Sequence, residues 1–561
     1  MINKKLSKAY LIIIFLFLIP TINANNIYYV TETSKESISI YPINGITFYV
    51  GGDGLGNFSK IQEAIENSSD GDTVFVYEDL SPYNENIEIT KSIHLEGENK
   101  QTTIIDGQGN GDTVYCEADN VQIHGFTINN GYKPGGNWWA AGIQLYICNF
   151  CIIFDNILID NFYGIRLYGA ENCTITNNTI NSNKNMGIWL HSLCHYSVIT
   201  NNIIENNVVS GIKIEGAFNC LVDENTIRYN PWDGIRLDRS AHTIISNNEI
   251  TENGYNAIVA RLSYENTIIN NNFTKNGLLI SQVYLVNNTV KNNIVNGKPL
   301  VYLTDGSDKI IDNAGQVILL RCNRITVKNL NISNIFYGIQ TYTCNDCVIT
   351  NNTLKNNFEG IYIGYDYPEI SKNLKITKNE IVENKNGIFL GYCVNAELTE
   401  NTIKNNLRSA INVSGKKHKI SKNIIVSNSE GIYIRGSKHI ITKNIIEENK
   451  QGIFADRLTY CFISGNDIKN NENGMYLFDS QKNIISKNNI FNSNYNDAFF
   501  IDSLKNIWRK NYWNKPFGPK IIFGLKYYYP SIWGPPNIIS VFWFDFRPAR
   551  KPYNIRTSEI I

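Results

Sequence analysis

A four-residue phrase beginning Gly-Ile returns along most of this 561-residue chain. In the first half its glycines fall 22 to 24 residues apart, at Gly142, Gly164, Gly187, Gly211 and Gly234. In the second half the phrase returns at Gly360, Gly387 and Gly431, and as Gly-Met at Gly474. A fixed period of this size is typical of solenoids, in which each repeat packs on its neighbours. The repeat therefore constrains the fold more than any local pattern does.

A second phrase, Asn-x-Ile, predicts what each repeat contains. It occurs at Asn178, Asn202, Asn225 and Asn248, and again at Asn401, Asn444 and Asn466. Apolar residues alternate with polar ones around both phrases, which indicates short β-strands. The Asn and Gly residues between the strands suit tight turns. About 23 residues with three short strands predict one turn of a parallel β-helix, with successive turns about 4.8 Å apart.

The alternation also predicts which side chains point inward. In each Gly-Ile-x-Leu phrase the Ile and Leu should fill the interior, and x should face outward. We expect the Asn residues of Asn-x-Ile to stack in an internal ladder, where their side-chain amides bond one another and the backbone of the turns. The chain is thus predicted to be all-β, apart from a short capping helix.

Three segments resemble a known superfamily. Residues 56–65 and 71–74 resemble the opening of many extracellular β-helix proteins, residues 296–303 a NosD-type insertion, and 511–513 the aromatic motif that closes such repeats. Residues 45–515 therefore resemble the right-handed parallel β-helix superfamily with the pectate-lyase fold, and most of all its NosD-like, secreted, carbohydrate-associated group. The resemblance implies a single right-handed parallel β-helix. It leaves the function open, because this scaffold carries lyases, hydrolases, epimerases, adhesins and binding proteins.

The N-terminal end has the features of an export signal. Residues 1–24 contain Lys4, Lys5 and Lys8, then an apolar stretch over 11–19 and a small residue at Ala24. The stretch is short for a membrane span, which favours a cleaved signal peptide over the alternative, an uncleaved anchor. We therefore expect a secreted or cell-surface protein that is monomeric and has no membrane span after cleavage.

The remaining chain divides into three predicted regions. Residues 25–110 should form an N-terminal cap with the first repeats, including a helix near 60–67 in which Ser59 and Gln62 make a capping box. Regular repeats run over 111–510, with an irregular insertion at 274–314. Residues 511–561 do not repeat and form an aromatic C-terminal extension.

Charge and cysteine content exclude several classes of partner. The formal net charge is zero, so no general field attracts nucleic acid. The eleven cysteines recur at fixed repeat positions, which favours free buried thiols over one or two disulfides. The pairs Cys148-x-x-Cys151 and Cys344-x-x-Cys347 are about eight repeats apart, too far to share one zinc ion. With seven His and three Met scattered along the chain, we expect no copper site, no other metal and no cofactor.

The outward positions of the first half suggest a groove for an acidic polysaccharide. Candidate binding residues are Trp138, Trp139, Tyr146, Arg166, Tyr168, Trp189, Lys213, Trp232 and Arg261. Flat aromatic rings suit sugar faces, and the cations would neutralise uronate carboxylates. Candidate catalytic residues are His191, Glu215, Arg236 and Asp238. Glu215 and Asp238 should lie on neighbouring turns about 5 Å apart. In the alternative interpretation these charges only pair along the surface, Lys213 with Glu215 and Arg236 with Asp238.

The second half has an outward row of aromatic residues, the aromatic column, made of Tyr362, Phe389, Tyr433, Phe454 and Tyr476. Such a row in water would be an adhesive patch. It would serve as a sugar platform, or the aromatic C-terminal extension would fold back over it; we expect the second.

Together these patterns predict an exported protein that binds polysaccharide without catalysis. The first alternative is a polysaccharide lyase, epimerase or glycoside hydrolase, chiefly one acting on uronate-containing glycan. It is disfavoured because the catalytic motifs of polygalacturonases and mannuronan epimerases are missing from the sequence. The second alternative is a structural or adhesive surface rod, or a NosD-like periplasmic maturation factor.

Overall fold

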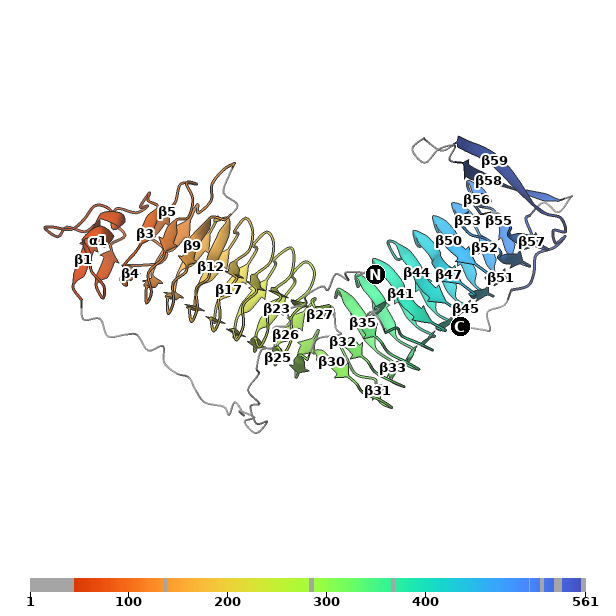
Figure 1. Ribbon diagram of the computed structural model, residues 1–561, viewed down its shortest axis with the longest axis horizontal. Helices are drawn as coiled ribbons and strands as arrows, with labels where there is room; N and C mark the ends of the chain where they lie inside the picture. The colour runs from red at the N-terminus through yellow and green to blue at the C-terminus, as the bar shows by residue number, and fades with distance from the viewer. Residues whose placement is uncertain are drawn as a thin grey trace, which may run out of the picture. The chain divides into compact units, whose positions relative to one another are not determined.

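The computed structural model describes residues 45–135, 139–281, 287–364, 369–503, 505–514, 519–528 and 537–555. These residues belong to one compact unit, Asn44–Ile561, and form a parallel β-solenoid of stacked turns (Figure 1). Within them α1 (Ile61–Asn67) is the only helix, and no helix is long and apolar enough to cross a membrane. The predicted signal peptide at 1–24 lies outside the described residues.

The Gly-Ile phrases form one parallel sheet in each half of the solenoid. Sheet 1, in the first half, consists of β3 (Ile87–Ile89), β6 (Val114–Cys116), β9 (Ala141–Tyr146), β12 (Tyr163–Tyr168), β15 (Ile188–His191), β18 (Ile212–Glu215), β21 (Ile235–Asp238), β24 (Ile258–Arg261) and β27 (Leu278–Ser281). Sheet 2, in the second half, consists of β30 (Lys298–Thr304), β32 (Gln316–Leu320), β35 (Tyr337–Tyr342), β38 (Glu359–Gly364), β41 (Asn386–Val394), β44 (Ser409–Lys416), β47 (Glu430–Ser437), β50 (Gln451–Thr459), β53 (Asn473–Phe478), β56 (Asn496–Ile501) and β58 (Lys520–Tyr528). The strands of sheet 1 from β9 on, and the strands of sheet 2, are longer than the other strands of their turns.

Two further sheets in each half close the turns with shorter strands. In the first half one runs from β1 (Thr47–Val50) to β28 (Thr289–Lys291), and the other from β5 (Ile104–Asp106) to β29 (Ile294–Val295). In the second half they run from β31 (Ile310–Ile311) to β57 (Ile507–Arg509), and from β34 (Asn331–Ser333) to β55 (Asn489–Phe491). The all-β, parallel solenoid predicted from the repeat is confirmed.

The interior follows the predicted alternation. Ile165 lies opposite Ile188, and both are completely buried. The asparagine ladder is also present: the Asn202 backbone N–H and side-chain Nδ2 both donate to Asn225 Oδ1, at 3.0 Å each. A second ladder, which the sequence analysis did not identify, starts five residues further along each turn and runs through Asn161, Asn183, Asn207, Asn230 and Asn253. Side-chain amides therefore supply hydrogen-bond partners for the buried backbone groups of the turns.

The parallel order breaks once between the two halves. β29 and β30 pair antiparallel, with Val295 opposite Lys298, and β30 then pairs in parallel with β32. This reversal lies within the 274–314 segment, where the sequence repeat loses its phase. It moves the Gly-Ile strands from sheet 1 to the new sheet 2.

Two predictions about the ends of the solenoid are wrong. Ser59 and Gln62 do not cap α1: its N-cap residue is Lys60, without a side-chain bond, and the Glu85 carboxylate accepts from the N–H groups of Ile61 and Gln62 at 2.9 and 3.0 Å. A carboxylate from the next turn thus replaces the local capping box because it reaches two free N–H groups at once.

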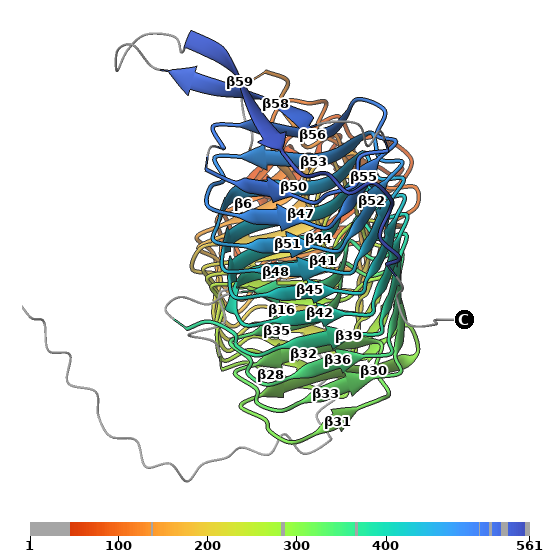
Figure 2. The same ribbon diagram turned by 90° about the vertical axis from the view of Figure 1, so that its right-hand side faces the viewer.

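The described part of the C-terminal extension does not cover the aromatic column. β58 instead pairs with β56 in the last turn, and β59 (Asn537–Asp545) pairs antiparallel with β58 beyond it (Figure 2). Asp545 is completely buried and ends the asparagine ladder, since its carboxylate accepts from Asn511 N (2.9 Å) and Trp513 Nε1 (3.2 Å). The extension closes the end of the solenoid, where open strands would otherwise meet water.

All eleven cysteines lie among the described residues, and all are buried and free. The prediction of free buried thiols is confirmed.

Candidate functional site

The predicted row of the first half is brought together on sheet 1. Strand register places Gln144, Arg166, Trp189, Lys213 and Arg236 opposite one another on successive strands. A parallel row two residues further on contains Tyr146, Tyr168, His191, Glu215, Asp238 and Arg261. The sequence repeat therefore placed these side chains on one surface correctly, but their accessibility differs from the prediction.

Arg166 is enclosed rather than exposed. Its guanidinium lies 5.0 Å from the ring of Trp139 and 5.3 Å from that of Trp189, and its Nη1 donates to Gln144 Oε1 at 2.9 Å. Arg166 and Trp189 are 9% and 5% exposed. Burial lowers the pKa of Arg166. Trp139, from the enlarged turn before β9, stacks on Trp189 and lies over Arg166, so these two side chains offer little surface to a ligand.

His191 belongs to the same enclosed cluster. Its ring stacks on Trp189 at 4.3 Å between centroids, and Arg166 Nη2 lies 3.2 Å from its Nδ1. Arginine only donates, so Nδ1 accepts and the proton resides on Nε2. Burial and the nearby Arg166 lower the pKa of His191. His191 is therefore a neutral histidine at neutral pH.

The two candidate catalytic carboxylates are both paired with cations. Glu215 and Asp238 lie opposite each other in register. Lys213 Nζ contacts Glu215 Oε2 at 2.6 Å, and Arg236 Nε donates to Asp238 Oδ2 at 2.9 Å. The ion pairs of the alternative interpretation are thus present. A uronate would have to displace them to reach either cation.

The remaining predicted binding residues do not form one site. Trp139, Tyr146 and Arg261 are exposed on the sheet 1 surface. Trp232 is 48% exposed, but its ring neighbours Tyr255 at 6.2 Å instead of the enclosed cluster. Trp138 lies outside the described residues.

A groove that the sequence analysis missed lies where the two halves meet, and we call it the junction groove. It has a volume of about 500 Å³ and is lined by residues that include Tyr255, Phe336, Phe358, Lys385 and Leu407. Phe336 stacks on Phe358 at 3.9 Å, Tyr255 meets Phe336 edge-on at 5.5 Å, and Lys385 Nζ lies 4.0 Å from the Phe358 ring. The sequence signal is a Phe two residues before the repeat glycine in two successive turns.

Polar side chains complete and extend the junction groove. Glu252 pairs with Lys275 at 3.1 Å within its lining. A second hollow of about 610 Å³ shares Leu407 with it and continues along later turns, lined mainly by Asn, Ser, Glu and Lys residues from Asn405 to Asn494. Together they offer aromatic, amide and charged groups along one edge of the solenoid.

The aromatic column is largely occupied by contacts between its own rings. Tyr362 stacks on Phe389 at 5.1 Å, and Phe454 on Tyr476 at 5.0 Å, with nearly parallel planes. Stacking covers part of the ring faces, and Asn412 interrupts the column between Phe389 and Tyr433. The column is therefore stabilised without a cover. A hollow of about 350 Å³ lies beside it, between Glu430 and Phe499.

One buried carboxyl outside the predicted set has an altered acidity. Glu359 follows Phe358 at the start of β38 and accepts a hydrogen bond from Asn386 Nδ2 at 2.7 Å. Burial raises the pKa of Glu359 to about 7. A carboxyl that remains half protonated near neutral pH has the acidity of a general acid.

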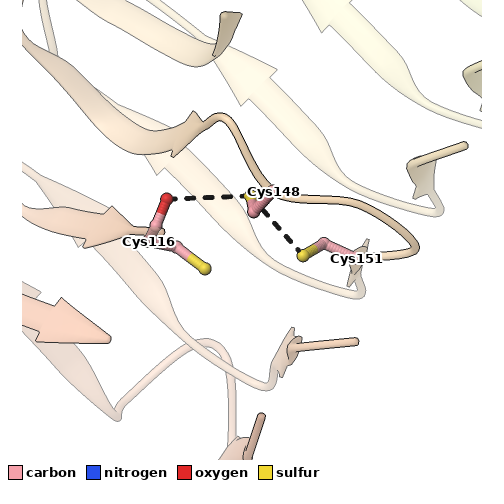
Figure 3. A group of neighbouring side chains, drawn as sticks. All are labelled: Cys116, Cys148 and Cys151. Carbon is pink, nitrogen blue, oxygen red and sulfur yellow. Dashed lines mark hydrogen bonds between the residues drawn. The ribbon is translucent and has the colours of Figure 1, made fainter. Parts of the chain in front are cut away.

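Three cysteine sulfurs also converge inside the first half. The Sγ atoms of Cys116, Cys148 and Cys151 all lie within 4.8 Å of one another, and the three residues are buried (Figure 3). The Cys148-x-x-Cys151 pair is visible in the sequence, whereas Cys116 precedes Cys148 by 32 residues and belongs to the previous turn, so its proximity was not predicted.

The stacked turns, the register and the ladders define a parallel β-solenoid protein with grooves along its edge. The chain matches the family described as periplasmic copper-binding protein (NosD) over residues 65–232 and 304–440, and it belongs to that family. It also matches the right-handed beta helix region over 194–314 and 386–522. The resemblance inferred from the sequence is thus confirmed.

Solved structures with a similar fold include an alginate lyase from Paenibacillus sp. str. FPU-7, with 14% identity, 57% of this chain and 99% of that chain covered, and a TM-score of 0.30. The A-module of the Azotobacter vinelandii mannuronan C-5 epimerase AlgE4 has 13% identity, with 64% and 93% covered and a TM-score of 0.29. The catalytic domain of a GH87 alpha-1,3-glucanase in complex with nigerose has 12% identity, with 64% and 64% covered and a TM-score of 0.37. No curated protein matches the chain.

Proposed function

We propose that this protein is exported and binds polysaccharide in the junction groove without catalysis. The observation that carries the proposal is the lining of that groove, where Tyr255, Phe336 and Phe358 stand beside amide and charged side chains in a volume of about 500 Å³. Sugar-binding sites need apolar ring surface together with a few polar groups that fix orientation. The groove continues along later turns, as an extended chain of sugars requires.

The enclosed cluster of sheet 1 supports a structural role instead. Arg166 and Trp189 are covered, and Glu215 and Asp238 are paired with cations. These contacts favour binding elsewhere over catalysis on sheet 1. Export is supported by the predicted signal peptide and by a family whose description is periplasmic. We further propose that the protein acts as a monomer.

A panel of neutral and uronate-containing polysaccharides, measured by isothermal titration calorimetry, tests the proposal. Tyr255→Ala should weaken binding about tenfold, the equivalent of roughly 1.4 kcal/mol, because it removes one ring contact. Tyr460→Ala is the matched control: Tyr460 is 57% exposed, compared with 43% for Tyr255, and lies outside the lining of the groove. The proposal would be contradicted if Tyr255→Ala bound glycan as tightly as the parent protein. It would also be contradicted if the parent protein bound none of the glycans.

The same panel separates binding from catalysis. A lyase would release unsaturated uronate, which absorbs in the ultraviolet, and a hydrolase would release reducing ends. We expect neither product. If turnover occurs and Glu359→Gln abolishes it while binding survives, the enzyme alternative replaces the binding one. Binding to no glycan at all would favour the structural rod.

The family description names copper, so the ligands that copper prefers are relevant to the side chains of this chain. Copper(I) prefers sulfur ligands, and Cys116, Cys148 and Cys151 supply three within 4.8 Å of one another. This donor set fits the monovalent ion. It supports copper handling as a second candidate function, in line with a NosD-like maturation factor.

A further inference from the structure

The two-stranded ribbon of β58 and β59 ends the solenoid and carries apolar side chains on both of its faces (Figure 2). Successive side chains of a strand point to opposite faces. On the inner face Ile522 is completely buried, and Trp543, its partner in register, packs against the core together with Val541. The inner face therefore holds the ribbon on the last turn.

The outer face of the ribbon has no such cover among the described residues. Register places Ile521 opposite Phe544 and Phe523 opposite Phe542, and the rings of the second pair are 5.4 Å apart. Phe546 continues the row, with its ring 5.3 Å from that of Phe544. We call this surface the ribbon face; its members are between 37% and 72% exposed, and they are Ile521, Phe523, Ile538, Phe542, Phe544 and Phe546. A contiguous apolar patch of this kind marks an interaction surface.

The end of the chain that carries the ribbon face is strongly basic. From residue 507 to the last residue there are nine Lys and Arg but only two Asp and Glu, although the whole chain has 51 of each. One of the two acids, Asp545, is completely buried at the end of the asparagine ladder. The positive charge of this end is therefore local, and the neutral net charge of the chain conceals it.

Several of these cations border the ribbon face. Arg547, Arg550 and Lys551 follow Phe546 closely in the sequence, and all three are exposed. The bond from Ala549 N to Asn511 O, at 2.9 Å, brings this segment beside Lys510, which is also exposed. An apolar surface is thus bordered by positive charge.

The size of the ribbon face disfavours a protein partner. β58 has nine residues, so two strands at the usual rise and spacing cover about 300 Å², whereas a stable protein interface buries about 800 Å² on each partner. A second copy of this chain would also bring two basic ends together. An acidic polymer would match the cations but would leave the Ile and Phe side chains in water.

A membrane surface satisfies both features. Apolar side chains of a peripheral protein enter the boundary between headgroups and acyl chains, while Lys and Arg approach the anionic headgroups. We propose that the ribbon face docks on an anionic lipid bilayer and so attaches the exported protein to a membrane by its C-terminal end. This inference does not depend on glycan binding in the junction groove.

Cosedimentation with vesicles tests the docking. The protein is the chain from residue 25 on, which retains the whole compact unit, so that the apolar stretch over 11–19 does not contribute. We expect binding to vesicles of phosphatidylcholine and phosphatidylglycerol in equal amounts, and much weaker binding to phosphatidylcholine alone. Added salt should weaken the binding, because it screens the cations. Absence of binding to the anionic vesicles would overturn the proposal.

An apolar variant assigns the contact to the ribbon face. Phe542→Ser should weaken vesicle binding about tenfold, because it withdraws one large apolar side chain from the bilayer boundary. Phe150→Ser is the matched control: Phe150 is 48% exposed and Phe542 50%, but Phe150 lies in a turn of the first half. Both proteins should melt at the temperature of the parent, since both side chains are exposed. The assignment is wrong if the two variants bind vesicles equally.

A charge variant tests the role of the basic border. The triple change Arg547→Gln, Arg550→Gln, Lys551→Gln should weaken binding to anionic vesicles at least about tenfold, because each cation near such a surface contributes roughly fivefold. It should also reduce the salt dependence. The triple change Lys416→Gln, Lys417→Gln, Lys438→Gln removes the same charge from exposed positions in the middle of the second half and should do neither.

Two further measurements distinguish the other occupants. Sedimentation velocity would reveal a dimer of the parent that Phe542→Ser dissociates, and titration with soluble polygalacturonate would reveal binding that the Gln variant loses. We expect a monomer, and no polygalacturonate binding that depends on these residues. Either opposite result, with vesicle binding that is no tighter, would replace the bilayer by a second copy or by an acidic polymer.

Discussion

The side-chain amide of Gln316 pairs with the backbone of Leu278 as a neighbouring strand would. Gln316 Oε1 accepts from Leu278 N at 2.8 Å, and its Nε2 donates to Leu278 O at 2.9 Å. Leu278 begins β27, the last strand of sheet 1, and Gln316 begins β32 in sheet 2. The amide thus satisfies backbone groups that lose their partners where the parallel order reverses, and it joins the two halves beside the junction groove.

Gln316→Leu should destabilise the protein by about 1–3 kcal/mol, because it leaves the buried N–H of Leu278 without its partner, whereas Leu278 O keeps the bond from Gln340 Nε2 at 3.1 Å. Gln451→Leu is the control, since Gln451 is half-buried and makes one long bond, at 3.3 Å, to Ile453 O. The control should change the free energy of unfolding by no more than about 1 kcal/mol. Urea denaturation measures both; equal effects would mean that the Gln316–Leu278 pairing does not hold the halves together.

Asn225→Leu tests the internal ladder. Asn225 Nδ2 donates to Ile199 O and to Asn248 Oδ1, at 2.9 and 3.0 Å, so the change should cost about 2–4 kcal/mol. Asn272→Leu is its control, because Asn272 is an exposed strand residue of β26 (Asn272–Thr274). If neither change alters the thermal unfolding of the protein, the ladder does not have the structural role that we assign to it.

The regular part of the fold could be predicted because strand alternation fixes which side chains face inward. Once Asn202 and Asn225 occupy the same position in successive turns, stacking brings their amides together. The same logic placed Arg166 next to Trp189 on sheet 1. These relations depend only on the period of the sequence.

The features that the sequence did not predict come from segments that depart from the repeat. Trp139 covers Arg166 from an enlarged turn whose path no repeat specifies. Tyr255 meets Phe336 only because the chain reverses direction between β29 and β30. The repeat therefore predicts which surface carries the charged row, but neither the burial of that row nor the junction groove.

Trp189→Ala should lower stability, although the sequence alone placed Trp189 in an open binding site. The side chain is 5% exposed and stacks on His191 and Trp139, so its removal should cost about 3–5 kcal/mol. Trp232→Ala removes a ring that is 48% exposed and should change stability by about 0.5 kcal/mol. Differential scanning calorimetry compares them, and a stable Trp189→Ala protein would show that the cluster is not a structural core.

The final prediction concerns two stacked histidines in the second half. His418 and His439 are buried, with ring centroids 5.0 Å apart. His418 N donates to His439 Nδ1 at 3.1 Å, and Cys461 N donates to Asn483 Oδ1 at 2.9 Å at an equivalent position two turns later. The histidines therefore occupy ladder positions that asparagine fills elsewhere. Burial lowers the pKa of His418 to about 4 and that of His439 to about 3.

Because both pKa values lie below that of an unfolded histidine, about 6.5, the unfolded chain binds more protons than the folded one as the pH falls. The two neutral histidines contribute their full stability above pH 6.5. This contribution is lost as the pH falls from 6.5 towards the pKa values of the folded protein. The low pKa of His418 alone should lower the free energy of unfolding by about 3 kcal/mol at pH 4 relative to pH 7. The double variant His418→Asn, His439→Asn should keep the ladder and lose this part of the pH dependence. Denaturant unfolding of both proteins at pH 7 and pH 4 measures the difference, and identical pH dependence in the two would show that these histidines are not neutral in the folded protein.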